Sequence, residues 1–315
     1  MRKYKKRRFV PGECLHVYQR SFNGFNLFYD VEDFIVFYTI ASVLSKVYNV
    51  SVLSMCQMID HVHLLVASDS IDDVSSYVRH YTSLYALEFN HDVGRSGPLF
   101  HKSFGSAPKK GGKKIRSAIV YIGNNPVEKK LCKLAEQYRW NYIAYMNNSN
   151  PFSVKGYSSS AKMERAKSEV RSMVKANKYL SYVQLRRILY GLSDEERNLL
   201  IDYIVRKYYM FDNESLMSYY EGYDDMIHAM KSTAGSEYDI KEVYCSGSDS
   251  VYSEMLHIVK RDFQIVPAKQ VIVLPIEKKL MLASHLKKNT SASVVQIAKF
   301  LHLDLSSEGN RLIGR

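Results

Sequence analysis

The sequence lacks the patterns that mark several large classes of protein. Its four cysteines are scattered, with no C-x-x-C pair, so we expect no cysteine zinc site and a reduced compartment in which the thiols are buried. The longest apolar run, near residues 35–44, is too short to span a membrane. There is no Walker loop, no G-x-G-x-x-G motif, no heptad run and no internal repeat, so function must be sought in other residues.

Acidic residues are fewer than basic residues. The 315 residues include 44 Lys and Arg but 32 Asp and Glu, which gives a net charge of +12 and a pI near 9.3. This balance favours a polyanionic partner, nucleic acid first and an anionic membrane second. The basic segment Met1–Arg8 could contact DNA phosphates or be a solvated tail. No apolar signal-peptide core follows it, so the expected location is the cytoplasm.

Residues 58–66 carry the first candidate site. Apolar Val62 and Leu64 alternate with His61 and His63, which predicts a β-strand with both imidazoles on one face. Two neutral imidazoles side by side are the beginning of a divalent-metal site. The alternative is two polar residues that lie by chance on a half-solvated strand.

Residues 115–127 carry the second candidate site. Apolar residues at helical spacings predict a helix, on which Tyr121 and Asn125 are four apart and share one face. Pro126 should end or kink that helix. Together the two segments offer two imidazoles and one amide oxygen to a metal, with a phenol beside them. The alternative for Tyr121 is a tyrosine packed on the sheet.

A basic segment, residues 109–116, leads into this helix as a glycine-containing loop. Helix N-termini attract phosphate, and contact with a DNA backbone would explain why cations gather there. Surface solubility is the alternative explanation. The cations are Lys109, Lys110, Lys113, Lys114 and Arg116.

The order of predicted elements indicates an α+β ferredoxin-like sandwich, with an antiparallel sheet and long helices on one face. We expect strands at residues 14–21, 51–58, 60–67 and 99–106, and helices at 31–47 and 74–89. Tyr77, Tyr81 and Tyr85 form an i, i+4, i+8 row, which favours a packed face over a platform for stacking bases.

The C-terminal half is predicted to be a mostly helical domain, residues 162–315, joined by a linker at 153–161 to a first domain at 1–152. Ser193 and Glu196 form a capping box that opens one helix. Residues 293–304 followed by 306–313 are typical of a helix-turn-helix, with an ordinary helical hairpin as the alternative. We expect this half to bind DNA or to cover the first domain.

Four segments, in order, resemble a known family. They are residues 16–24, the His-Val-His-Leu-Leu run at 61–65, residues 97–104, and the Tyr-Ile-x-x-Asn-Pro-Val run at 121–127. The pattern resembles the single-tyrosine HUH transposases, specifically the REP-associated branch of the IS200-like group, and covers about residues 10–150. Asp60 departs from the family, which more usually has Asn there, so the surroundings of the metal could differ.

The resemblance implies a metal-dependent endonuclease and strand transferase that acts on single-stranded DNA beside a hairpin. Tyr121 would be the nucleophile and would form a 5′-phosphotyrosine, and His61, His63 and Asn125 would hold Mg²⁺ or Mn²⁺. Arg20 would join the lysine-rich segment in binding DNA. The implied setting is a bacterial-type cytoplasm and nucleoid, with a monomer or homodimer as the active species.

Two other functions stay open. One is a relaxase or replication initiator of the wider HUH class, although such proteins often carry paired tyrosines or a third histidine in the strand. The other is a non-catalytic nucleic-acid-binding protein on the same fold. The presence of His61, His63, Tyr121 and Asn125 together argues against a non-catalytic protein.

Overall fold

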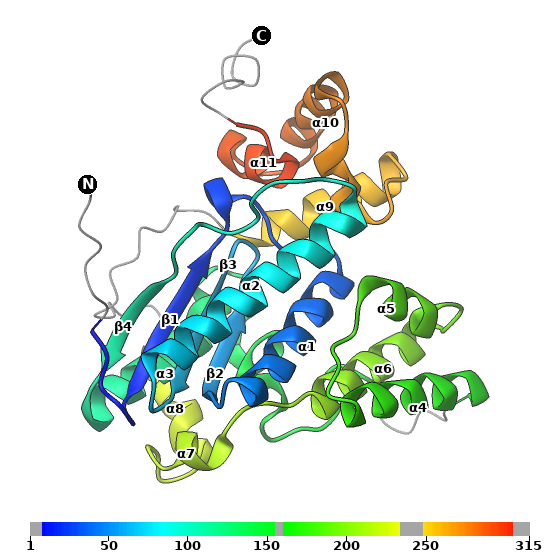
Figure 1. Cartoon of the computed structure of the whole chain (residues 1–315). Coiled ribbons are helices and arrows are strands. Elements are labelled where there is room, and N and C mark those ends of the chain that lie inside the picture. The colour runs from blue at the N-terminus through cyan, green and yellow to red at the C-terminus, as the bar shows by residue number, and fades with distance from the viewer. Residues whose placement is uncertain (1–7, 155–159, 234–247, 305–315) are drawn as a thin grey trace.

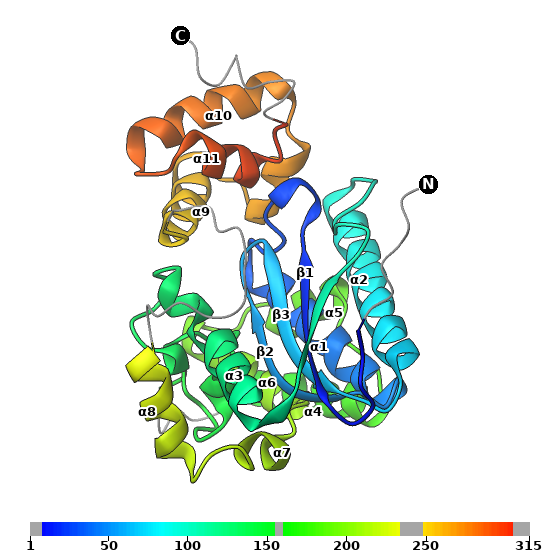
Figure 2. The ribbon, with the colours of Figure 1, turned by 90° about the vertical axis from the view of Figure 1, so that its left-hand side faces the viewer.

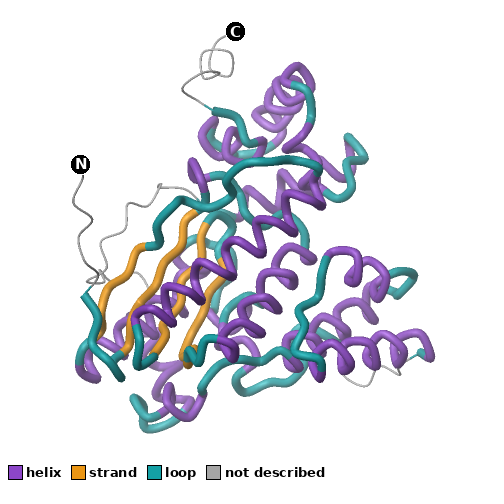
Figure 3. The backbone as a smooth tube through the Cα atoms, in the orientation of Figure 1, coloured by secondary structure: helices purple, strands orange, loops and turns teal. Residues whose placement is uncertain are grey.

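The computed structural model describes residues 8–154, 160–233 and 248–304, and at its centre is a four-stranded antiparallel sheet (Figure 3). The strands are β1 (Cys14–Arg20), β2 (Ser51–Gln57), β3 (His61–Ala67) and β4 (Gly105–Lys109), in the order β2-β3-β1-β4. They are connected as β1-α1-β2-β3-α2-β4, which is the ferredoxin-like arrangement. The α+β fold expected from the sequence is therefore confirmed.

Two long helices, α1 (Val31–Val47) and α2 (Ile71–Val93), cover one face of the sheet (Figure 1). A capping box formed by Asp30 and Asp33 begins α1. Gly94 ends α2 with a φ of 77°, a left-handed conformation that glycine adopts without strain. The apolar residues of β3 alternate with its histidines, and their burial under these helices forms the core.

The tyrosine row on α2 is a packed face, as expected. Tyr77, Tyr81 and Tyr85 are all fully buried. The Tyr77 hydroxyl donates to the backbone oxygen of Ala41 at 3.2 Å, and the Tyr85 hydroxyl donates to that of Leu27 at 2.8 Å. The row therefore joins α2 to α1 and to the segment before α1.

The fourth strand lies later in the chain than the expected range, 99–106. The first part of that range is a loop, and β4 begins only at Gly105. The expectation was wrong because Leu99 and Phe100 are apolar for another reason, since they are buried against the core from a loop. β4 itself has little apolar pattern and contains Pro108, which an edge strand tolerates because it need not donate an N–H.

The helix α3 (Gly111–Glu128) lies on the opposite face of the sheet from α1 and α2, as Figures 1 and 2 show together. The predicted fold placed helices on one face and did not include this third layer. Most of the basic segment is helical and was expected to be a loop. Lys110 is the N-cap of α3, which begins directly after β4. Pro126 lies within the last turn of α3, and the helix ends two residues later.

The rest of the described chain is helical, as expected, and its helices lie around the sheet in three groups (Figure 1). The first group lies beside α1 and comprises α4 (Ala161–Lys175), α5 (Tyr182–Leu189) and α6 (Asp194–Lys207). The second lies against β2 and α3 and comprises α7 (Asn213–Met217) and α8 (Tyr223–Thr233). The third comprises α9 (Ser250–Asp262), η4 (Ala268–Val273), α10 (Ile276–Asn289) and α11 (Val294–Leu301). Short 3₁₀ turns complete the fold, at η1 (Phe22–Gly24), η2 (Ala135–Gln137) and η3 (Tyr142–Tyr145).

Two predictions concern particular residues of the C-terminal half. The capping box of Ser193 and Glu196 is present at the start of α6. The first helix of the predicted helix-turn-helix is α11, but residues 306–313 lie outside the described residues. The helix-turn-helix therefore stays a prediction, as does the division into two domains at residues 153–161.

The structure also bears on membrane-spanning segments and on the cysteines. Within residues 8–154, 160–233 and 248–304, no helix is long and apolar enough to cross a membrane. Cys14, Cys56 and Cys132 are free thiols, and the first two are buried. Cys245 lies outside the described residues.

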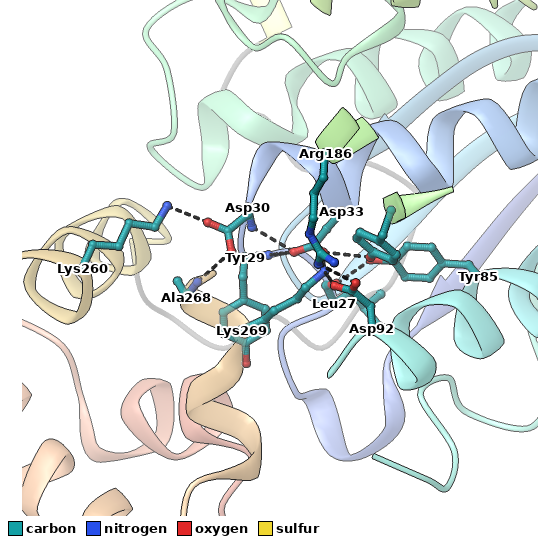
Figure 4. Close-up of polar contacts among 11 residues, drawn as sticks. Leu27, Tyr29, Asp30, Asp33, Tyr85, Asp92, Arg186, Lys260, Ala268 and Lys269 are labelled. Carbon is teal, nitrogen blue, oxygen red and sulfur yellow. Dashed lines mark hydrogen bonds and ion pairs between the residues drawn. The ribbon is translucent and has the colours of Figure 1, made fainter. Parts of the chain in front are cut away.

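A buried lysine joins the third group of helices to the sheet region (Figure 4). Lys269 of η4 is 1% exposed, and its Nζ lies 2.6 Å from Oδ1 of Asp33 on α1 and 2.8 Å from Oδ2 of Asp92 on α2. From α5, the ring centroid of Tyr182 lies 3.4 Å from Nζ, and its hydroxyl donates to Asp33 at 2.8 Å. One ammonium thus connects elements that are far apart in the sequence.

Replacing Lys269 by alanine should destabilise the protein by about 3–5 kcal/mol, because Asp33 would stay buried without its cation and Asp92 would keep only its pair with the half-exposed Arg186. Lys260→Ala is the control, since Lys260 pairs with Asp30 at 2.6 Å but is 43% exposed, and it should cost less than about 1 kcal/mol. Denaturant unfolding of both full-length variants, followed by circular dichroism, measures the difference. Equal losses would contradict the role assigned to Lys269.

Candidate active site

Polar side chains of β3 and β1 gather on the face of the sheet that α3 covers. His61 and His63 share this face, and their ring centroids lie 4.8 Å apart with an interplanar angle of 85°. In the register of β1 with β3, Arg20 lies opposite His61 and Tyr18 opposite His63. Residues opposite each other in an antiparallel pair point to the same side, so strand pairing alone assembles this group.

A third histidine, His16 of β1, joins the same face. It is fully buried, and its Nε2 lies 3.0 Å from Nδ1 of His63, with the two rings stacked at 5.2 Å and 18°. From the sequence, His16 was expected only as part of the first strand. His16 and Tyr18 are two residues apart in a strand, so the sequence predicts that they share one face. The contact of His16 with His63 depends on the register between two strands, which the sequence does not show.

Burial keeps these histidines neutral. Burial, and then the nearby charge of Lys109, lowers the pKa of His16 to about 3. Burial, and then the charge of His61, lowers the pKa of His63. A neutral imidazole can present a lone pair to a divalent ion, so both rings are in the protonation state that metal binding requires.

Asp60 orients His61 from outside the site. Its Oδ1 lies 2.6 Å from Nδ1 of His61. Burial raises the pKa of the Asp60 carboxyl, but the hydrogen bond and charge of His61 and the ammonium of Lys299 lower it overall. Nε2 of His61 is buried and has no hydrogen-bond partner among the described residues. A carboxylate on one ring nitrogen with the other nitrogen open is the arrangement of a metal-binding histidine.

The helix α3 brings Tyr121 next to the histidines. Its ring centroid lies 5.4 Å from that of His63, edge to face at 82°, and 5.8 Å from that of His16. Asn125 follows one turn later, and its Nδ2 donates to the backbone oxygen of Tyr121 at 2.9 Å. This bond fixes the amide and leaves Oδ1 buried, with no hydrogen-bond partner in the part of the chain that is described.

From its outer side, α3 is held by the C-terminal half. Gly123 faces α8, where a Cβ would lie 2.8 Å from Cε of Met230. Asn124 Nδ2 donates to the backbone oxygen of Met230 at 2.9 Å, and Asn141 Nδ2 donates to that of Gly123 at 2.8 Å. The helix that carries Tyr121 is therefore fixed between the sheet and α8.

The cations predicted to bind DNA differ in their surroundings. Lys109 is buried at the end of β4. Arg116 donates to the backbone oxygen of Tyr219 at 3.0 Å and pairs with Asp225 at 3.4 Å, so it also joins α3 to the C-terminal half. The exposed members are Arg20, Lys110, Lys113 and Lys114.

The donor set fits a small divalent ion held by nitrogen and oxygen. Among the described residues, no three His, Cys, Asp or Glu side chains are grouped to hold a metal. The set predicted from the sequence instead combines His61 and His63 with an amide oxygen. The open Nε2 of His61 and the open Oδ1 of Asn125 are two buried atoms that such an ion would satisfy.

The sequence model of one protein family matches part of the chain. Residues 26–125 match the sequence model of the family described as "Transposase IS200 like". Among solved structures, one similar chain is the REP-associated tyrosine transposase bound to a REP hairpin. It is 16% identical, and the match covers 51% of this chain and 93% of that chain with a TM-score of 0.40. No curated protein sequence matches the chain.

The ring of Tyr18 crosses β4 at Gly105, where a Cβ would lie 1.8 Å from Cζ of Tyr18. Gly105→Ala should displace this ring and cost about 1–3 kcal/mol in stability. Gly222→Ala is the matched control, because a Cβ there meets nothing within 4 Å. Unfolding curves of the two variants measure the effect, and a Gly105→Ala protein as stable as the parent would show that Tyr18 does not lie there.

Proposed function

We propose that this chain, whose residues 26–125 match the model of the IS200-like transposase family, cleaves and rejoins single-stranded DNA through a covalent bond to Tyr121. The observation that carries the proposal is the position of the Tyr121 ring beside His63, with centroids 5.4 Å apart. This contact puts a possible nucleophile next to an imidazole that is suited to hold a metal.

We propose that His61, His63 and Asn125 hold Mg²⁺ or Mn²⁺. The support is the neutral state of the buried His63, the hydrogen bond that Nδ1 of His61 donates to Asp60 and that leaves Nε2 of His61 open, and the open amide oxygen of Asn125. A divalent ion bound there would polarise and orient a phosphate oxygen. The role of the protein residues is to keep these donors fixed beside Tyr121.

In the proposed reaction the Tyr121 hydroxyl attacks the scissile phosphorus. A bond forms between the phenolic oxygen and phosphorus while the bond from phosphorus to the 3′ oxygen breaks. The phenol loses its proton, and the leaving oxygen becomes a free 3′-hydroxyl. The 5′-phosphotyrosine conserves the bond energy, so the reverse attack rejoins DNA without ATP. His16 is a poor acceptor for the phenolic proton, because its pKa is lowered to about 3.

Two separate groups of cations could neutralise phosphates. Arg20 ends β1 opposite His61, whereas the exposed lysines at the start of α3 follow Lys109, which pairs with Cys14 at the other end of β1. Tyr121 is 1% exposed, so a phosphate reaches its hydroxyl only when covering groups move aside. We propose a hairpin-bearing DNA element as the substrate and the nucleoid as the location.

Tyr121→Phe should abolish the covalent product while leaving the fold intact, because it removes only the hydroxyl. The measurement is a denaturing gel of full-length protein mixed with end-labelled single-stranded DNA and Mn²⁺. A DNA-linked band from the Tyr121→Phe protein, as strong as from the parent, would move the nucleophile elsewhere. A parent that binds DNA but forms no such band would favour the non-catalytic alternative.

His63→Ala and Asn125→Ala should each weaken Mn²⁺ binding by at least about tenfold, because each removes a proposed ligand. Tyr121→Phe should leave the affinity unchanged, which separates loss of metal from loss of nucleophile. His101→Ala is the matched control, since His101 is exposed in the loop before β4. Titration of Mn²⁺ followed by electron paramagnetic resonance measures the affinities, and parent-like binding by His63→Ala would contradict the ligand assignment.

A further inference from the structure

One side chain from the C-terminal half, Lys299 of α11, reaches the surroundings of the candidate metal site. Its Nζ lies 3.3 Å from Oδ2 of Asp60. The other oxygen of the same carboxylate, Oδ1, lies 2.6 Å from Nδ1 of His61. Asp60 therefore connects an ammonium near the C-terminus to an imidazole on the central sheet.

The position of Lys299 is fixed by its own contacts. Its side chain is 18% exposed and passes over Gly24, where a Cβ would lie 3.1 Å from Cε of Lys299. The φ of Gly24 is +69°, so a larger residue there would also be strained. The backbone N–H of Asn26 donates to the Lys299 oxygen at 3.4 Å. The lysine is thus held on the turn after β1.

The end of α11 is docked on the same segment that supports Asp60. The Tyr29 hydroxyl donates to the backbone oxygen of Phe300 at 2.5 Å. The Leu27 N–H donates to the oxygen of Ile59, directly before Asp60, at 2.7 Å. Because the segment around residues 25–29 contacts both α11 and residue 59, movement of α11 would be transmitted to Asp60 by the backbone as well as by the ion pair.

We propose that Lys299 is a positioning residue for the metal site. It holds the Asp60 carboxylate in place, and that carboxylate holds His61 in the tautomer and orientation that leave Nε2 for the metal. The inference rests on the proposed function, because it takes His61 as a metal ligand. It follows that the site has its full metal affinity only when α11 is docked.

The test compares Mn²⁺ affinity among full-length variants. Lys299→Met keeps the apolar stem but removes the ammonium, and should weaken binding by about tenfold, as loss of an outer partner of a ligand does. Lys299→Arg keeps the cation and should restore affinity to within about twofold of the parent. Lys288→Met is the matched control, because Lys288 is exposed on the neighbouring α10. An unchanged affinity in Lys299→Met would overturn the proposal.

A double-mutant cycle tests the route through Asp60. Asp60→Asn alone should also weaken Mn²⁺ binding, and adding Lys299→Met to it should cause no further loss. Additive losses would show that Lys299 acts by another path and would overturn the inference. The unfolding midpoints of all variants, measured in parallel, show whether loss of affinity reflects loss of fold.

Failure of this inference is distinguishable from failure of the proposed function. If His61→Ala abolishes Mn²⁺ binding while Lys299→Met leaves it unchanged, only the positioning role is wrong. If the parent binds no Mn²⁺, or His61→Ala binds it as the parent does, the metal site itself is wrong and both proposals fail.

Discussion

The antiparallel pairing of β1 with β3 is the interaction on which the candidate site depends, because it decides which side chains meet. His16 contacts His63, and Arg20 lies opposite His61, only in the observed register. A slip of one residue would turn every β1 side chain to the other face. Burial of the alternate residues Leu15 and Val17 opposes such a slip, so the apolar core sets the geometry of the polar face.

Contacts from the C-terminal half hold in place the elements that carry the candidate site. The outer side of α3 rests on α8, where Gly123 permits close approach and Met230 accepts a hydrogen bond from Asn124. Lys269 satisfies two buried carboxylates on α1 and α2, and Lys299 contacts Asp60. These contacts come from different helix groups and approach the sheet region from different sides. The C-terminal half is therefore part of the support of the site, and not only an appended module.

What could be predicted from the sequence was local. The face shared by His61 and His63 follows from strand alternation, and that shared by Tyr121 and Asn125 from helical spacing, so both pairs were available without a structure. The contact of His16 with His63 was not, because it requires the register between distant strands. β4 was misplaced because the apolar pattern at Leu99 belongs to a buried loop, whereas the edge strand itself has little apolar pattern. The ion pair of Lys299 with Asp60 joins residues that are 239 positions apart, and no local sequence pattern predicts it.

The buried lysine of η4 also has a consequence for the order of events during synthesis. Asp33 and Asp92 leave the ribosome long before Lys269 does, and nascent chains fold from the N-terminus onward. Until the lysine emerges, Asp33 lacks the cation that compensates its burial and Asp92 has only Arg186, and burying a carboxylate without its cation is costly. The ferredoxin-like region therefore completes its packing late in translation. A chain proposed to cut DNA thus reaches its final form only after most of it has been made, and a prematurely terminated product would lack the counterion that its core requires.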